Sequence, residues 1–146
     1  MALRLYFINK IFKKKIFNFK HDKFLDFGCG ASHLYGYMIE KDWHNLKYTG
    51  LDISNDFCRV SKQKYPENKY ICADVLESEE DIGVYDYVIM NGVFTEKVGL
   101  SFEDMFDYFK RLLLRVYPLA RKGIAFNVMS KNVAWEREDL FHLSLD

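Results

Sequence analysis

A short apolar run followed by two closely spaced glycines is the part of this sequence best suited to binding chemistry. The run Phe24–Phe27 leads into Gly28, Cys29 and Gly30, and good helix formers follow from Ser32. This order predicts a buried strand, a tight turn and the start of a helix. Glycine lets a backbone take positive φ and approach a ligand closely. The open N–H groups at a helix start favour polar or anionic ligand atoms. The stretch therefore predicts a nucleotide-type binding site.

Acidic residues at the ends of strand-like runs narrow the choice of ligand. Asp26 lies at the end of the first run, Asp52 ends the second, and Asp74 immediately follows the third. A carboxylate in the position of Asp52 can accept hydrogen bonds from both hydroxyls of a ribose. Acidic residues repel a pyrophosphate, so an adenosine ligand without one is favoured over a dinucleotide. His33 stands where the dinucleotide fingerprint needs a small residue, and we expect it to obstruct packing of the helix on the strand.

Taken together, these motifs resemble those of class I S-adenosylmethionine-dependent methyltransferases over roughly residues 24–128. The segment Asp86–Phe94 resembles the family's fourth strand and the loop that faces the transferred methyl group. The resemblance implies a Rossmann-like fold and S-adenosyl-L-methionine as cofactor. It also implies cofactor-binding roles for Asp26, Gly28, Cys29, Gly30, Asp52, Ile53, Asp74, Val75 and Asn91. In this scheme the glycine turn lines the methionine and ribose, Asp52 holds the ribose diol, and Asp74 lies near the adenine amino group. Ser32 departs from the pattern, because many members carry a further glycine there.

Each of these motifs also has a plain structural interpretation when it is taken alone. A pair of glycines after a strand is often only a turn. Asp52 is suited to cap the helix expected from Ser54, as Asp commonly does, and Asp74 is equally acceptable as a loop carboxylate. All three together, at the ends of successive strands, favour a cofactor site.

The residues after the fourth strand bear on the methyl acceptor. Asn91–Phe94 lacks the Pro-Pro-aromatic pattern of enzymes that methylate exocyclic amines of bases or glutamine. The sequence also lacks the lysine–aspartate–lysine–glutamate set of ribose methylation, so nucleic acid is not the expected substrate. Methyl transfer from a sulfonium requires alignment and, where the acceptor holds a proton, a base. Glu96 is the candidate base, although a solvated loop charge is the plainer interpretation. We expect O- or N-methylation of a small molecule, with ligand or partner binding without catalysis as the alternative.

Composition sets the broad class of the protein. The chain has 146 residues, of which 49% are hydrophobic, so one domain with a substantial core is expected. It has neither an apolar run long enough to span a bilayer nor a recognisable signal peptide. Cys29, Cys58 and Cys72 have neither zinc-site nor disulfide spacing. We therefore expect a cytoplasmic protein with reduced cysteines and no metal.

The net charge is zero but unevenly distributed. Residues 1–23 hold seven Lys or Arg and a single Asp, whereas the remainder carries an excess of six acidic residues. Leu5, Ile8 and Phe12 recur at helical spacing, which predicts an amphipathic helix over 3–19 within a basic N-terminal segment, residues 1–22. Such a helix suits an anionic membrane surface or nucleic acid, but packing of its apolar face on the domain is favoured.

Strand and helix patterns alternate along residues 23–146, the proposed cofactor-binding domain. This alternation predicts a doubly wound α/β fold with a mostly parallel sheet of about five strands and helices on both faces. The strands are expected near 23–27, 47–52, 69–73, 85–90 and 123–128, and the helices near 32–41, 54–65 and 101–120. Only eighteen residues follow Val128, so we expect the strand pair that closes the sheet in the family to be missing, in a natural short form or a fragment. We expect the tail from Lys131 or a second copy in a homodimer to cover the fifth strand.

Overall fold

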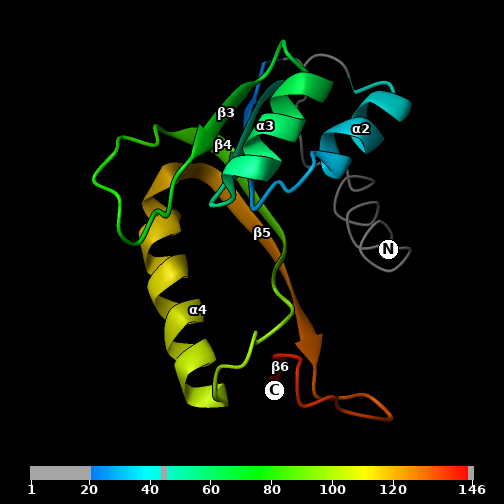
Figure 1. Ribbon diagram of the computed structural model, residues 1–146, viewed down its shortest axis with the longest axis vertical. Helices are drawn as coiled ribbons and strands as arrows, with labels where there is room; N and C mark the ends of the chain where they lie inside the picture. The colour runs from blue at the N-terminus through cyan, green and yellow to red at the C-terminus, as the bar shows by residue number, and fades with distance from the viewer. Residues whose placement is uncertain (1–20, 44–45, 145–146) are drawn as a thin grey trace.

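The computed structural model describes residues 21–43 and 46–144. Six strands form one sheet in the order β3-β2-β1-β4-β5-β6, and every neighbouring pair is parallel (Figure 1). The strands are β1 (Lys23–Phe27), β2 (Lys47–Asp52), β3 (Lys69–Cys72), β4 (Tyr85–Phe94), β5 (Ala120–Ser130) and β6 (His142–Leu143). The predicted doubly wound α/β fold is confirmed, with a sixth, two-residue strand beyond the five expected.

The helices cover both faces of this sheet. They are α2 (His33–Glu40), α3 (Asn55–Lys64) and α4 (Phe102–Val116), the last followed by a 3₁₀ turn, Tyr117–Leu119. Successive residues of a strand point to opposite faces. Leu25 of β1 shares a hydrophobic cluster with Leu112 of α4, whereas Phe24 shares another with Leu34 of α2. Helices α2 and α4 therefore lie on opposite sides of β1.

Helix α4 begins and ends for identifiable reasons. The Ser101 hydroxyl accepts a hydrogen bond from the Asp104 N–H at 3.0 Å and caps the first turn. The helix was predicted to reach residue 120 but ends at Val116. Pro118 follows two residues later, and its missing N–H prevents the helical hydrogen bond from continuing.

The C-terminal tail, residues 131–144, folds back against the ends of β4 and β5. The Lys97 N–H donates to the Asp139 carbonyl, and the Phe141 N–H donates to the Thr95 carbonyl, both at 2.9 Å. Strand β6 pairs only with Met129 and Ser130 of β5. The tail thus covers the last two residues of this edge, and within residues 21–43 and 46–144 no strand covers the outer side of β5 before them.

The predicted N-terminal helix, residues 3–19, lies outside the described residues. The proposed division into segments 1–22 and 23–146 therefore stays a prediction. None of the helices in the described part of the chain combines the length and apolarity needed to cross a membrane.

Candidate functional site

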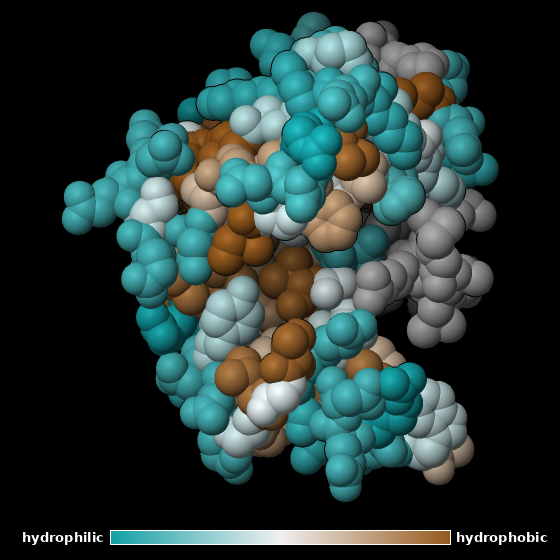
Figure 2. Space-filling model, in the orientation of Figure 1, coloured by the Kyte–Doolittle hydropathy of each residue, from teal (hydrophilic) through white to brown (hydrophobic). Residues whose placement is uncertain are grey.

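A cleft opens at the carboxyl ends of β1 to β4, the edge where open α/β sheets bind ligands. Its volume is about 390 Å³, within the usual range for small-molecule sites. The space-filling view shows hydrophobic residues gathered in the middle of this face of the molecule (Figure 2). The cleft is lined by Phe27, Gly28, Gly30, Leu51, Asp52, Ile53, Phe57, Ala73, Asp74, Val75, Asn91, Gly92, Val93, Tyr108 and Leu112.

The glycine turn after β1 has the backbone that its sequence predicts. Gly28 and Gly30 have φ of 71° and 52°, a region that residues with a side chain rarely adopt. A Cβ on Gly28 would lie 2.8 Å from the Val93 side chain, so only glycine permits this close approach. The turn meets the end of β4 at this point.

The N–H groups of Gly28, Cys29 and Gly30 in the turn are hydrogen-bonded within the protein. The N–H groups of Gly28 and Cys29 both donate to the Leu51 carbonyl, at 2.8 and 3.0 Å. The Gly30 N–H donates to the Asp52 carboxylate. These bonds tie the turn to β2. A pyrophosphate would have to compete for donors that the protein already uses, which favours a ligand without phosphate.

Asp52 is held rigidly between the turn and the next helix. Its Oδ2 accepts from the Gly30 N–H and its Oδ1 from the Ser54 N–H, both at 2.9 Å. The residue is only 8% exposed, yet it lines the cleft. A carboxylate oxygen has more than one lone pair, so each can accept a further hydrogen bond from a ligand. Asp52 therefore holds the backbone at the start of α3 and can also accept hydrogen bonds from a ligand.

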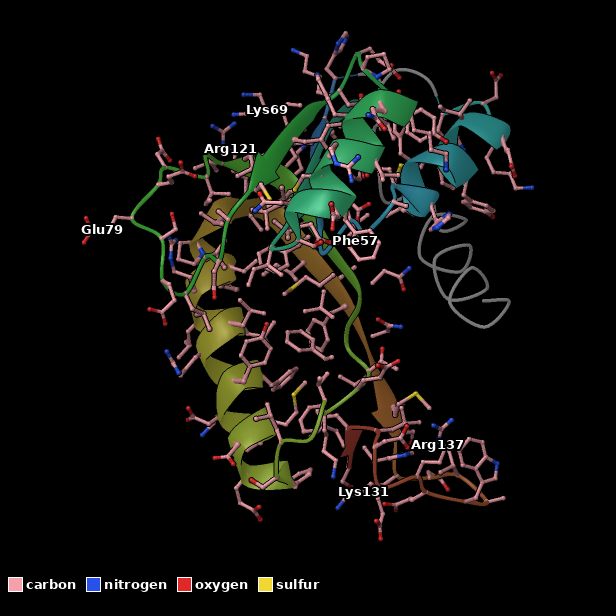
Figure 3. All side chains as sticks on the ribbon, viewed as in Figure 1. Phe57, Lys69, Glu79, Arg121, Lys131 and Arg137 are labelled. Atoms are coloured by element: carbon pink, nitrogen blue, oxygen red, sulfur yellow. The ribbon has the colours of Figure 1, made fainter. Side chains whose placement is uncertain are left out.

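The side of the cleft beyond Asp52 combines apolar surface with a second carboxylate. Ile53 is 67% exposed and Phe57 is 48% exposed, and Phe57 lies at the end of α3 nearest the cleft (Figure 3). The Oδ1 atom of Asp74 accepts from the Leu76 N–H at 3.0 Å, and Val75 lines the cleft beside it. This side offers a flat apolar surface and an acceptor, which suits a heteroaromatic ring with an amino group.

Asp26 at the end of β1 and Cys29 within the turn are buried and do not line the cleft. Burial raises the pKa of Asp26 to about 7, against the opposing effect of a hydrogen bond from Tyr48, and the charge of Asp52 adds to the increase. The Tyr48 hydroxyl donates to Asp26 Oδ2 at 2.7 Å. Burial also raises the pKa of the Cys29 thiol. Neither side chain is therefore placed to contact a ligand in the cleft.

The expectation that His33 obstructs helix packing is wrong. His33 is exposed, and Ser32 is the small residue enclosed where the helix meets the sheet. The Ser32 hydroxyl donates to Ser61 Oγ at 2.9 Å, and the Ser61 hydroxyl donates to the Gly30 carbonyl at 2.8 Å. The Ser32 side chain is therefore linked to the Gly30 carbonyl of the glycine turn through the Ser61 hydroxyl.

The end of β4 forms a bulge that reaches the cleft. Met90 pairs with Phe126 and Phe94 pairs with Val128, so three residues of β4 oppose a single residue of β5. Gly92 has φ of 85°, and its N–H donates to Asn127 Oδ1 at 2.7 Å. Asn127 was not among the residues predicted from the sequence. The sequence signal for the bulge was a glycine inside an apolar run, but it did not identify the partner.

Glu96 lies away from this cleft. It is exposed, its backbone forms an antiparallel bridge with Leu140 of the tail, and it is not among the lining residues. The structure therefore brings together Gly28, Gly30, Asp52, Ile53, Asp74, Val75 and Asn91 of the predicted site, and leaves Asp26, Cys29 and Glu96 outside the lining.

The charged side chains that line the cleft are all acidic. Asp52 and Asp74 line it, whereas its described lining contains no Lys, Arg or His. Lys69 and Arg121 lie toward the opposite end of the sheet from Phe57 (Figure 3). Among the described residues, no group of three or more His, Cys, Asp or Glu could hold a metal ion. The cleft is therefore suited to a neutral or cationic ligand.

Comparison with known families identifies a relationship that covers most of the domain. The model of a methyltransferase domain matches residues 25–123. No curated protein sequence gives a significant match.

Several solved methyltransferases share the fold at low sequence identity. Coclaurine N-methyltransferase, bound to N-methylheliamine and SAH, has a TM-score of 0.61 at 15% identity over 82% of this chain and 33% of its own. The plantazolicin methyltransferase in complex with SAH gives 0.54 at 22% identity, over 75% and 39% of the two chains. A TehB-like methyltransferase from Corynebacterium glutamicum gives 0.53 at 17% identity, over 82% and 67%. This chain thus spans well under half the length of the first two.

Proposed function

Because this chain belongs to the class I S-adenosylmethionine-dependent methyltransferase family, we propose that it methylates an oxygen or nitrogen of a small-molecule acceptor. The family's cofactor, S-adenosylmethionine, supplies a methyl group on a sulfonium, which is already a good leaving group. The observation that carries the proposal is the cleft beside the glycine turn. There Asp52 is fixed by two backbone N–H groups, and the described lining holds no cationic side chain for a pyrophosphate.

Each part of the cleft has a proposed role toward the cofactor. The free lone pairs of Asp52 accept the two ribose hydroxyls. Ile53 and Phe57 cover the adenine ring, and Asp74 Oδ2 accepts from its amino group, since Oδ1 is already bonded to the Leu76 N–H. The methionine portion is placed along Gly28 and Gly30, which line the cleft together with Val93. Asp52 and Asp74 also favour the positive charge of the sulfonium form.

The protein's remaining task is to align the acceptor with the methyl group. Asn91–Val93 at the end of β4 form the wall closest to the glycine turn, so the acceptor is placed against them. Glu96 is proposed as a base only for an acceptor that extends beyond the cleft lining, because its carboxylate is exposed on the loop after β4. An amine that arrives unprotonated needs no such base.

Two structural relatives support a small-molecule acceptor. Coclaurine N-methyltransferase was solved with N-methylheliamine, and the plantazolicin methyltransferase is named for plantazolicin. Nucleic acid is not proposed, since the base- and ribose-methylation motifs are missing from the sequence. Cys29, Cys58 and Cys72 are free thiols, which accords with a cytoplasmic location.

A homodimer is proposed from the edge of the sheet. Within the described residues, the outer side of β5 pairs with β6 only at Met129 and Ser130. An unpaired edge is a template for association, and a symmetric dimer is the commonest way to cover one. Light scattering at several concentrations tests this, and a monomer at all concentrations contradicts it.

Asp52 offers the sharpest test of the site. Asp52→Asn keeps the size of the side chain but removes its charge and one acceptor. Loss of a charge-assisted hydrogen bond lowers the affinity for S-adenosylhomocysteine about tenfold to a hundredfold, measured by calorimetry. Asp56→Asn is the matched control, since Asp56 is an exposed carboxylate of the same helix start that pairs with Arg59 outside the cleft. Equal affinities in the two variants contradict the assignment. Binding without methyl transfer to any acceptor would favour the alternative, a non-catalytic binding protein.

A further inference from the structure

The bulge at the end of β4 is held by a side chain from another strand. Between the pairs Met90–Phe126 and Phe94–Val128, β5 contributes only Asn127. A bulge interrupts the ladder and leaves backbone groups without their usual partners. The Gly92 N–H donates to Asn127 Oδ1 at 2.7 Å, so the side chain replaces a missing backbone acceptor.

The orientation of the Asn127 amide follows from this bond. A backbone N–H can only donate, so the amide oxygen must face Gly92 and the amide nitrogen must face away. Phe126 and Val128 pack against the cluster beneath α4. Asn127, between them, projects from the other face of β5. Its oxygen is therefore committed to the bulge, not to the hydrophobic core.

The bulge in turn closes on the glycine turn. Gly92 takes a φ of 85°. The side chain of the next residue, Val93, lies so near Gly28 that a Cβ on Gly28 would come within 2.8 Å of it. Phe94 then returns to the core and is fully buried. A movement of Gly92 would shift Val93 and change the gap between β4 and the turn.

We infer that Asn127 is a positioning residue that sets the distance between the glycine turn and the end of β4, and so the place where acceptor and methyl group meet. The inference rests on the proposed function, because the distance between the turn and β4 affects the reaction only if methyl transfer takes place in this cleft. Asn127 acts through Gly92 and is not among the residues that line the cleft. The apolar run 123–128 predicts a strand but indicates no particular role for Asn127. That role follows from the register of β4 on β5 and from the hydrogen bond to Gly92.

The test combines ligand affinity with a local measurement. In Asn127→Ala, the Gly92 amide loses its acceptor, so its hydrogen exchange accelerates at least about tenfold, and the affinity for S-adenosylhomocysteine falls about three- to tenfold. Asn127→Asp keeps an oxygen in place and restores both values toward those of the parent chain. Ser101→Ala removes the cap of α4 at a residue that does not line the cleft, so it lowers the melting temperature without changing either value.

Each inference can fail separately. Unchanged exchange at Gly92, or unchanged affinity, in Asn127→Ala overturns the positioning role. If Asn127→Asp is as impaired as Asn127→Ala, the role is also overturned, because the accepted hydrogen bond would then not be the cause. Failure of the parent chain to bind S-adenosylhomocysteine overturns the proposed function, while the exchange of Gly92 still tests the contact with Asn127.

Discussion

The cleft has two sides that are built in different ways. On the side of β1 and β2, the glycine turn, Asp52 and the start of α3 are joined by bonds from backbone N–H groups. On the side of β4 and β5, the Gly92 N–H in the bulge donates to Asn127, 35 residues away, and the tail bonds to Thr95 just after β4. The first side uses contacts between consecutive βα units, whereas the second needs segments that are distant along the chain.

This difference has a consequence for how each side responds to mutation. A change in the glycine turn acts at the place where the ligand is proposed to bind, while most of the fold remains intact. A change in the tail acts on packing against α4 and reaches the cleft indirectly, through the positions of β4 and of α4, whose Tyr108 and Leu112 line it. The turn side should therefore lose affinity before stability, and the tail side should lose stability before affinity.

Gly28→Val should have the largest effect on binding. The new side chain would meet Val93 and would force a β-branched residue to a φ of 71°. We expect about a hundredfold loss of affinity for S-adenosylhomocysteine, since the clash costs about 1–3 kcal/mol, the strained backbone adds about 1–3 kcal/mol, and about 2.8 kcal/mol is a hundredfold. Gly99→Val is the control, because Gly99 has a φ of 81° with nothing near its Cβ position. If both variants keep the affinity of the parent, the turn is not the site.

Phe141→Ala, on the tail side, should lower the free energy of unfolding more than it lowers ligand affinity. Phe141 is fully buried and its ring lies 5.5 and 5.8 Å from those of Phe102 and Phe109. Truncation of a buried Phe costs about 3–5 kcal/mol of unfolding free energy, which denaturant unfolding measures. Trp135→Ala on the same tail, at a residue 60% exposed, should cost about 0.5 kcal/mol or less. Similar losses in the two variants would mean that the tail does not pack as described.

Asp26 provides a pH test of the turn side. Its pKa is raised to about 7, chiefly by burial, so between the unfolded pKa and pH 7 the native state holds a proton that the unfolded state releases. Asp26 therefore makes stability fall as pH rises, by about 2 kcal/mol between pH 5 and pH 7. Asp26→Asn should remove this contribution, so the stability difference between variant and parent changes with pH in favour of the variant. A difference that stays constant from pH 5 to pH 7 contradicts the buried, protonated state.

The two sides also differ in how far the sequence predicts them. The strands around the turn, β1 to β3, and the placement of Gly28, Asp52 and Asp74 at the cleft follow from local motifs. The use of the turn's N–H groups by Leu51 was not predicted, because a sequence does not show which carbonyl a donor reaches. The exposed position of His33 was not predicted either, because a sequence does not show which neighbours a side chain meets.

The β4–β5 side was predicted in outline only. Both strands are longer than the ranges 85–90 and 123–128 expected from their apolar runs. In β4 the expected loop after residue 90 is a bulge at Gly92 within the strand. Strand β6 contains two residues, too few to show a pattern. Asn127 and Phe141 take their roles from partners 35 and 46 residues away, and one sequence contains no signal for such pairs.

Electron density for a bound ligand tests the central claim most directly. Crystals soaked with S-adenosylhomocysteine, and separately with NAD, would be compared at the cleft. We predict density for S-adenosylhomocysteine only, with its ribose hydroxyls bonded to Asp52 and its adenine between Ile53 and Phe57. Density for NAD with its pyrophosphate at Gly28 and Gly30, or an empty cleft with S-adenosylhomocysteine, would contradict the account.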